Sequence, residues 1–145
     1  MRTIYSSKTD LWETPQDLFN RYDDQYHFDI DLCALPENAK CTRYFTPQDD
    51  ALIQEWSGVC WCNPPYGRQL AKWVAKAATS NATVVMLLPA RTDTRWFHEY
   101  CLPHGKVEFI RGRVHFGGSV NPAPFASMVV VFNGKDVENG RVYRA

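Results

Sequence analysis

The segment ATVVMLLP, residues 82–89, is apolar at almost every position and constrains the fold more than any other part of the chain. A half-exposed strand alternates apolar and polar side chains, so an uninterrupted apolar run is typical of a strand covered on both faces. Such a strand needs neighbouring strands at its edges and helices on both sides. With 145 residues, the chain is long enough to build this core as one domain, residues 1–145.

Helix and strand patterns alternate along the rest of the chain. A helix is expected over residues 14–26, with Thr14 as its N-cap and Pro15 at its first position, and two more are expected over residues 70–77 and 93–101. Strand patterns occupy residues 27–33, 41–46, 58–62, 82–89, 106–110 and 127–132. This alternation predicts an α/β three-layer sandwich with a mainly parallel sheet. Because no helix separates the last two strands, an antiparallel C-terminal strand is expected.

Composition narrows the class of protein. No apolar run is long enough to span a bilayer and the first ten residues carry no signal-peptide core, so we expect a cytoplasmic protein that binds no membrane. Five cysteines without a C-x-x-C pair favour reduced thiols over a disulfide framework. Cys60 and Cys62 lie in an apolar run with no His at finger spacing, so buried thiols are favoured over a metal site.

The formal charge is zero overall but unevenly divided along the chain. Residues 1–60 hold 5 Lys or Arg and 11 Asp or Glu, whereas residues 61–145 hold 11 and 5. This division suits an acidic pocket for a cationic ligand beside a basic face for a phosphate backbone, and it also suits two solvated surfaces of opposite sign.

The tetrapeptide NPPY, residues 63–66, follows the strand at residues 58–62 and is the strongest candidate for a functional site. Two prolines fix two φ angles and remove two backbone donors, which makes this corner stiff. In an open α/β sheet, ligands bind beyond the carboxyl ends of the strands, where the corner and Asp31 both fall. The plain alternative is a strand-terminating turn with a packed tyrosine.

The corner is suited to recognising a planar amine. The Asn63 side chain and the Pro64 main chain each offer a carbonyl acceptor, and Tyr66 offers a flat face on which a ring can stack. Two acceptors in fixed directions fit the two N–H protons of an exocyclic amino group on a purine. Because they also favour a pyramidal nitrogen and stabilise the positive charge that develops during attack, the corner can activate the amine without a protein nucleophile or a metal.

Several motifs, in order along the chain, resemble the phage-type DNA N6-adenine methyltransferase (Dam) family. They are WETPQDLF, FDIDLCA, PENAKCTRYFTPQDDAL, WCNPPYG, LLPARTDTRWFH, GRVHF and APFASMVVVF. The resemblance implies a Rossmann-like class I methyltransferase domain that transfers a methyl group from S-adenosylmethionine to N6 of a flipped-out adenine in double-stranded DNA. It also implies a phage or prophage protein that acts in the cytoplasm of a bacterial host.

The resemblance assigns roles to individual residues. Catalytic roles fall on Asn63, Pro64, Pro65 and Tyr66, and contacts with the methyl donor fall on Trp12, Thr14, Pro15, Asp31 and Asp50. The glycine-rich turn that methyltransferases usually carry after the first strand is missing from DLCALPENAKC, and no carboxylate follows RYF to hold the donor ribose. Asp49, Asn38 and Glu37 are the alternatives for that contact.

DNA contacts are expected from two polar segments in the second half of the chain. The residues concerned are Arg91, Thr92, Arg95, Arg111, Arg113, His115 and Phe116. The arginines suit phosphates or the major-groove edge of guanine, and Phe116 suits a place beside the flipped base; ordinary surface charge and core packing are the plain alternatives. No segment is long enough for a separate target-recognition domain, so recognition is expected from loops such as residues 111–126 or from the second subunit of a homodimer.

Two other functions stay open from the sequence. An RNA amine or a glutamine side-chain amide would also fit two acceptors and an aromatic face, although glutamine-modifying relatives normally keep the glycine-rich turn. A catalytically silent DNA-binding module on the same scaffold is the alternative from a different class.

Overall fold

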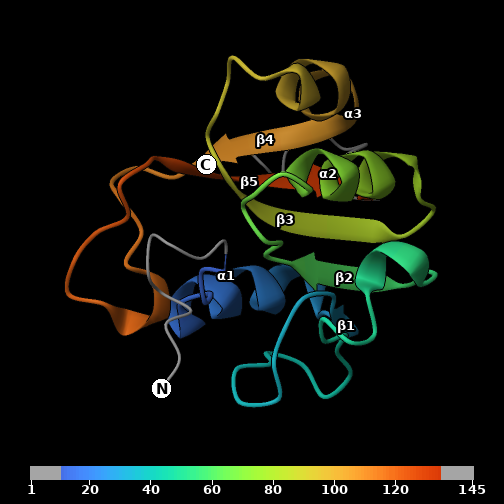
Figure 1. The fold of residues 1–145 in the computed structure, drawn as a ribbon, viewed down its shortest axis with the longest axis horizontal. Coiled ribbons are helices and arrows are strands. Elements are labelled where there is room, and N and C mark those ends of the chain that lie inside the picture. Colours follow the sequence, from blue (N-terminus) through green and yellow to red (C-terminus); the bar gives the residue numbers. More distant parts are fainter. Residues whose placement is uncertain (1–10, 135–145) are drawn as a thin grey trace.

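Residues 11–134 are described by a computed structural model, and they form a five-stranded sheet with helices packed on it (Figure 1). The strands are β1 (Ile30–Asp31), β2 (Val59–Cys62), β3 (Thr83–Pro89), β4 (Gly105–Phe109) and β5 (Ser127–Phe132). Their order across the sheet is β1-β2-β3-β5-β4. The strands β1, β2 and β3 pair in parallel, whereas β5 lies between β3 and β4 and is antiparallel to both.

The predicted α/β class and the antiparallel C-terminal strand are confirmed, but the sheet is mixed rather than mainly parallel. Two of its four pairings are parallel and two are antiparallel. The cause is the place of β5: because it inserts between two strands instead of joining the edge, one reversed strand changes two pairings.

The core is centred on β3, as the apolar run predicted. Residues 84–88 have no exposed surface. On β2, the Trp61 ring packs against Phe19 and Tyr22 of α1 (Gln16–Tyr26), with ring centroids 5.5 and 6.4 Å apart. The helix α2 (Leu70–Thr79) lies on the viewer's side of β5 in Figure 1. Within residues 11–134, no helix combines the length and the apolar character needed to cross a membrane.

Four predicted elements differ from the structure. The first helix begins at Gln16 with Pro15 as its N-cap residue, so the prediction that Thr14 caps it is wrong. The Thr14 hydroxyl is engaged instead by the side chain of Asn63, which donates a hydrogen bond to it. The strand predicted over residues 41–46 is reduced to a single bridge between Asp31 and Tyr44.

The first predicted strand is also short, since only Ile30–Asp31 remain of residues 27–33. The Asp31 carboxylate accepts hydrogen bonds from the backbone N–H groups of Cys33 and Lys40, which turns the chain away from the sheet directly after the strand. Such side-chain acceptors compete with the strand ladder for backbone donors.

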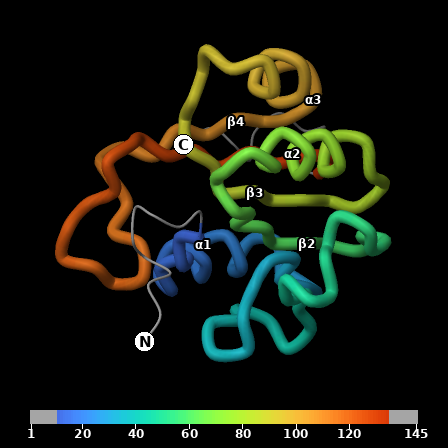
Figure 2. The backbone as a smooth tube through the Cα atoms, viewed as in Figure 1, coloured from blue at the N-terminus to red at the C-terminus, as the bar shows by residue number. Residues whose placement is uncertain are grey.

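The third predicted helix is irregular. Its π-helical turn η2 (Phe97–Cys101) leads into the short α3 (Leu102–His104), and two single-turn elements, η1 (Ala51–Ile53) and η3 (Phe116–Gly118), occur elsewhere. The segment between β4 and β5, drawn in orange in Figure 2, is a long loop that extends beyond the carboxyl end of β4. It therefore stands at the edge of the sheet where the NPPY corner also lies.

Candidate active site

The corner that follows β2 holds the Asn63 amide in one orientation. Asn63 is only 8% exposed, and its Nδ2 donates hydrogen bonds to the main-chain oxygen of Trp12 and to Oγ1 of Thr14, the latter at 3.0 Å. Because a main-chain carbonyl can only accept, the amide atom that faces Trp12 must be the NH₂ group and not the oxygen. This contact fixes which way the Asn63 side chain points.

The same arrangement leaves the Asn63 carbonyl oxygen without a partner among the described residues. Within residues 11–134, Oδ1 is buried and accepts no hydrogen bond. A buried acceptor that stays unpaired costs about 1–3 kcal/mol, and most native proteins avoid the situation. An incoming N–H donor would remove this cost, so Oδ1 is a prepared acceptor.

Tyr66 is packed into an aromatic cluster, which we define as Trp12, Tyr66, Phe116 and Phe125. The rings of Phe116 and Phe125 lie edge-on to the Tyr66 ring, with centroids 6.3 and 5.7 Å away, and both also contact Trp12. The Tyr66 hydroxyl donates to the main-chain oxygen of Leu87 at 2.8 Å. Tyr66 is 5% exposed, and this burial raises its pKa well above the ordinary value, so the hydroxyl stays a donor and is no general base.

A hollow opens beside Asn63. It contains about 470 Å³ of space, solvent-open part included, and its lining consists of residues 11–14, residues 33–35, Asn38, Pro47 and Asn63. The amide of the corner therefore borders a space that a ligand can enter.

A second hollow adjoins the first. Leu11, Cys33 and Pro47 line both of them, and the second extends to Asp50 and Pro65. Asp50 has a left-handed backbone with φ of 55°, and its carboxylate accepts from the backbone N–H of Leu52. Three of the five predicted donor contacts line these hollows: Trp12, Thr14 and Asp50.

Asp31, also predicted as a donor contact, lies behind the first hollow's wall residue Cys33, to whose backbone N–H it is bonded. Among the described residues, it belongs to neither lining, and its two carboxylate oxygens accept from the N–H groups of Cys33 at 3.2 Å and Lys40 at 3.0 Å. Asp31 is 3% exposed, and burial raises its pKa to about 6, against the opposing effect of these hydrogen bonds. The carboxylate thus shapes the loop that forms one wall of the first hollow.

The three alternatives for the ribose contact lie in different places. Asn38 lines the first hollow, and its side-chain oxygen accepts from the N–H of Leu35 at 2.9 Å. Glu37 and Asp49 are exposed and, among the described residues, line neither hollow. Residues 11–134 contain no cluster of three or more His, Cys, Asp or Glu side chains with which to hold a metal.

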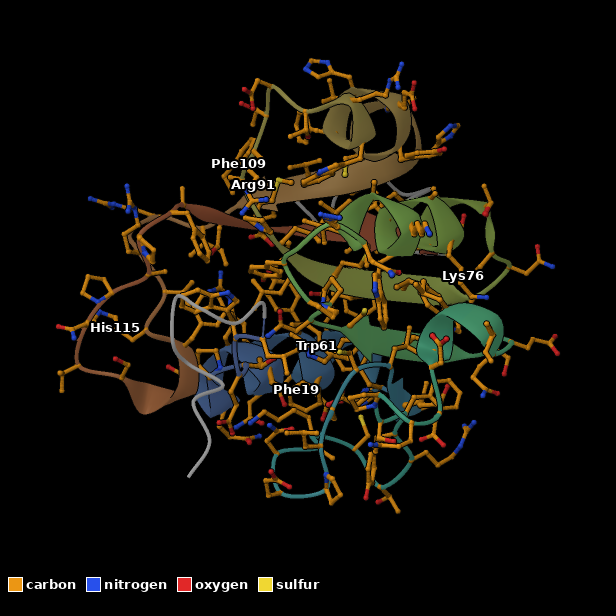
Figure 3. The ribbon with its side chains drawn as sticks, viewed as in Figure 1. Phe19, Trp61, Lys76, Arg91, Phe109 and His115 are labelled. Carbon is orange, nitrogen blue, oxygen red and sulfur yellow. The ribbon has the colours of Figure 1, made fainter. Side chains whose placement is uncertain are left out.

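The predicted DNA contacts lie on two exposed segments. Arg91 follows the end of β3, whereas His115 stands far out on the long loop, as Figure 3 shows. Arg95 pairs with Glu99 at 3.5 Å, and the main-chain oxygen of Thr92 contacts the His98 ring. Of the predicted DNA contacts, Phe116 packs against Tyr66 of the corner, with ring centroids 6.3 Å apart.

The loop at residues 111–126 is tied together by its own side chains. Arg113 donates to the main-chain oxygen of Ala123 at 3.2 Å, and Nδ1 of His115 lies 2.9 Å from the main-chain oxygen of Ser119. Arg111 is exposed on the same loop. Phe116 lies on the same loop and is only 3% exposed. Its ring packs in the aromatic cluster and so anchors the loop there.

Sequence reasoning missed two parts of this site. Phe125 was not singled out, although it lies in the motif APFASMVVVF, and the contacts that hold the Asn63 amide were not foreseen. An aromatic residue flanked by Pro and Ala in a polar loop was the available signal for Phe125. No sequence signal links positions 12 and 14 with position 63.

Comparison with known proteins gives consistent results. The family model described as "DNA N-6-adenine-methyltransferase (Dam)" matches residues 2–138. The chain is 38% identical over 119 residues to a DNA N-6-adenine-methyltransferase of Haemophilus phage HP1, an alignment that covers 76% of this chain and 68% of the relative. It is 33% identical over 95 residues to the DNA N-6-adenine-methyltransferase of Escherichia phage T1, covering 62% of this chain and 40% of that protein. It is also 37% identical over 65 residues to the putative methyltransferase YfdM of Escherichia coli K12, covering 39% of this chain and 71% of that protein.

Proposed function

This chain belongs to the DNA N-6-adenine-methyltransferase (Dam) family, and on that premise we propose that the Asn63 corner carries methyl transfer to N6 of adenine in DNA. The family assignment makes the chain an adenine-specific DNA methyltransferase. The roles of individual residues, the methyl donor and the access of the base are proposals that rest on the geometry of the site.

Within residues 11–134, Oδ1 of Asn63 is buried and unpaired, and this observation carries the proposal. The N6 amino group of adenine has two N–H donors, and one of them would satisfy this oxygen; the main-chain carbonyl of Pro64 is the proposed acceptor for the other. As N6 attacks, positive charge develops on the nitrogen, and acceptors already in place stabilise it without reorganisation. The two prolines make the corner stiff, which keeps both carbonyl groups in fixed directions.

The two adjoining hollows suit S-adenosylmethionine as the donor. When bound, S-adenosylmethionine supplies a sulfonium-activated methyl group, and its transfer forms an N–C bond, breaks the S–C bond and releases one N6 proton. Trp12 and Thr14 would line the donor beside Asn63, and Asn38 and Asp50 would offer polar contacts for its ribose and adenine. The acidic first half of the chain favours a cationic ligand.

Access of the base requires flipping, which costs about a few kcal/mol for a paired adenine. Tyr66 and Phe116 would flank the extruded ring, and the exposed arginines of residues 91–95 and 111–113 would contact the phosphate backbone. Because Phe116 and Phe125 already pack against the Tyr66 ring, the long loop must shift as the base enters.

The proposal extends to the finer fold class and to the cellular setting in which the protein acts. With α1 packed on Trp61 and α2 on the sheet near β5, the arrangement supports a three-layer, Rossmann-like class I methyltransferase domain. The similarity to phage proteins supports action in the cytoplasm of a bacterial host. Target recognition would come from loops of this one domain or from a homodimer.

The experiment that tests the function is methyl mapping. The full chain would be incubated with methyl-labelled S-adenosylmethionine and a duplex DNA of known sequence, and the product would be digested to nucleosides. We expect the label in N6-methyladenine at one repeated sequence. If the wild-type chain binds DNA but places no label in adenine, the proposal fails and a silent DNA-binding module becomes the better account.

A further inference from the structure

Thr14 contacts both the hollow proposed for the donor and the Asn63 amide. It lines the hollow proposed for the donor, and its hydroxyl accepts a hydrogen bond from the Asn63 amide at 3.0 Å. Thr14 is 6% exposed and Asn63 8%, so this contact is shielded from water. The main-chain oxygen of Trp12, two residues earlier, accepts the second N–H of the same amide.

The orientation of an asparagine amide decides what it can bind. A rotation of 180° about the last side-chain bond exchanges the NH₂ group and the oxygen, which have nearly the same shape but opposite hydrogen-bonding character. With the oxygen turned toward the target, Asn63 accepts from an amine. With the NH₂ group turned toward the target, it presents donors to another donor, and the amine is rejected.

We propose that Thr14 is a positioning residue for methyl transfer, whose hydroxyl, together with the Trp12 carbonyl, holds the Asn63 amide with Oδ1 toward the reacting amine. This inference rests on the proposed function, because it assigns Thr14 to the step that Asn63 performs. Two acceptors for the two N–H protons make the productive orientation favourable, whereas one acceptor leaves a proton unpaired and the amide free to turn.

This arrangement also couples the two halves of the site. Residues 11–14 form one wall of the donor hollow and, through Trp12 and Thr14, the clamp on the amide. A donor seated against this wall would hold the clamp in place. The acceptor for the amine is then best aligned when the methyl group is present.

The test compares Thr14→Val with Thr14→Ser. Valine keeps the shape but removes the acceptor, whereas serine keeps the hydroxyl. With DNA and S-adenosylmethionine saturating, we expect kcat to fall at least tenfold in Thr14→Val and less than threefold in Thr14→Ser. In Thr14→Val, the fall in kcat should exceed the loss of affinity for S-adenosylmethionine, measured by calorimetry, by at least threefold.

Thr83→Val is the matched control. The Thr83 hydroxyl donates to the main-chain oxygen of Asn133 at 2.9 Å, at the opposite edge of the sheet, so the same substitution there removes a threonine hydrogen bond, a more exposed one, far from the corner. We expect kcat to stay at the wild-type value in this variant. An equal loss in Thr83→Val and Thr14→Val would assign the effect to general destabilisation and overturn the positioning role.

Other outcomes separate this inference from the proposed function. If wild type is active and Asn63→Ala is not, but Thr14→Val retains the wild-type kcat, the positioning role is wrong and the proposed function stands. If Thr14→Val loses donor affinity in proportion to kcat, Thr14 is a donor contact only. If wild type itself methylates no adenine, the proposed function fails first.

A second measurement does not depend on the stability of Thr14→Val. In the nitrogen-15 NMR spectrum of the wild-type chain, the Asn63 side-chain NH₂ signals are identified by their absence in Asn63→Ser. We expect both protons to exchange with water at least tenfold more slowly than those of the exposed Asn81. Fast exchange of either proton would show that the clamp does not hold the amide, and would overturn the inference.

Discussion

Two asparagine side chains, Asn63 and Asn133, secure opposite edges of the same sheet, and their surroundings differ. At the amino edge, where the parallel strands β2 and β3 begin, Nδ2 of Asn133 lies within hydrogen-bonding distance of three main-chain oxygens, those of Ala77, Ser80 and Ala82. At the carboxyl edge, where these strands end, Nδ2 of Asn63 donates to two acceptors. Both amides therefore act as clamps through their NH₂ groups.

The carbonyl oxygens distinguish the two residues. Asn133 is exposed, so its side chain is open to solvent. The Oδ1 of Asn63 is buried and unpaired within residues 11–134, beside a hollow. An amide of the same type is thus a structural tie at one edge and a prepared acceptor at the other, and the difference comes from burial and from the adjoining space.

The largest expected effect comes from replacing the two asparagines in turn. In Asn63→Ala, we expect turnover to fall about a thousandfold because the acceptor for the amine is lost, with a change in donor affinity of only a few-fold. In Asn133→Ala, we expect turnover to stay near wild type while the free energy of unfolding falls by about 2 kcal/mol. Steady-state methylation, donor calorimetry and urea unfolding would measure these changes.

That comparison breaks down if the two variants behave alike. Equal losses of stability with unchanged turnover would make Asn63 a second structural tie. Equal losses of donor affinity and turnover in Asn63→Ala would place the corner in the donor site.

Tyr66 gives the next largest effect at the carboxyl edge. In Tyr66→Ala, we expect a ten- to hundredfold loss of turnover, since stacking of a base on an aromatic ring contributes about 1–3 kcal/mol, together with a marked loss of stability for a buried ring. In Tyr66→Phe, only the bond to Leu87 is lost, and we expect about 1 kcal/mol less stability with turnover nearly unchanged. A large loss of turnover in Tyr66→Phe would assign the role to the hydroxyl instead of the ring.

Asp31 makes the stability of the carboxyl edge depend on pH. Burial raises its pKa to about 6 in the folded chain, from an ordinary value of 3.8, so the folded state keeps a proton that the unfolded state releases. Stability should therefore decrease as the pH rises from about 4 to 6, by about 3 kcal/mol in total, and should level off above that range. Urea unfolding of wild type and Asp31→Asn across this range would measure it. A slope that persists in Asp31→Asn would assign the dependence to another group.

The smallest effect is expected from the arginines of the long loop. In Arg111→Ala, we expect a few-fold weaker binding of duplex DNA at low salt and a salt slope reduced by about one phosphate contact. Lys72→Ala, an exposed cation on α2, is the matched control and should leave the slope unchanged. An effect of Arg111→Ala confined to one base position would indicate direct readout of that base.

Local patterns were sufficient to predict much of this structure. The apolar run at residues 82–89 predicted a fully buried central strand, and the apolar stripe at residues 70–77 predicted α2. The family inferred from the motifs is confirmed by comparison with known proteins. The α/β class follows from the order of elements alone.

What the sequence could not predict depends on contacts between distant positions. Thr14 resembles a helix cap, but Asn63 engages its hydroxyl, 49 positions along the chain. The first strand has a strand pattern over seven residues, yet the Asp31 carboxylate captures the following backbone N–H groups and ends it early. The insertion of β5 between β3 and β4 likewise depends on the whole sheet.

The most direct test of this account is the structure of the full chain bound to duplex DNA and a non-reactive analogue of S-adenosylmethionine. We expect an extruded adenine whose N6 lies about 3 Å from Oδ1 of Asn63, with the NH₂ group of Asn63 still bound to Trp12 and Thr14. An adenine seated at the donor with its N6 bound elsewhere, while Oδ1 stays unpaired, would contradict the central claim.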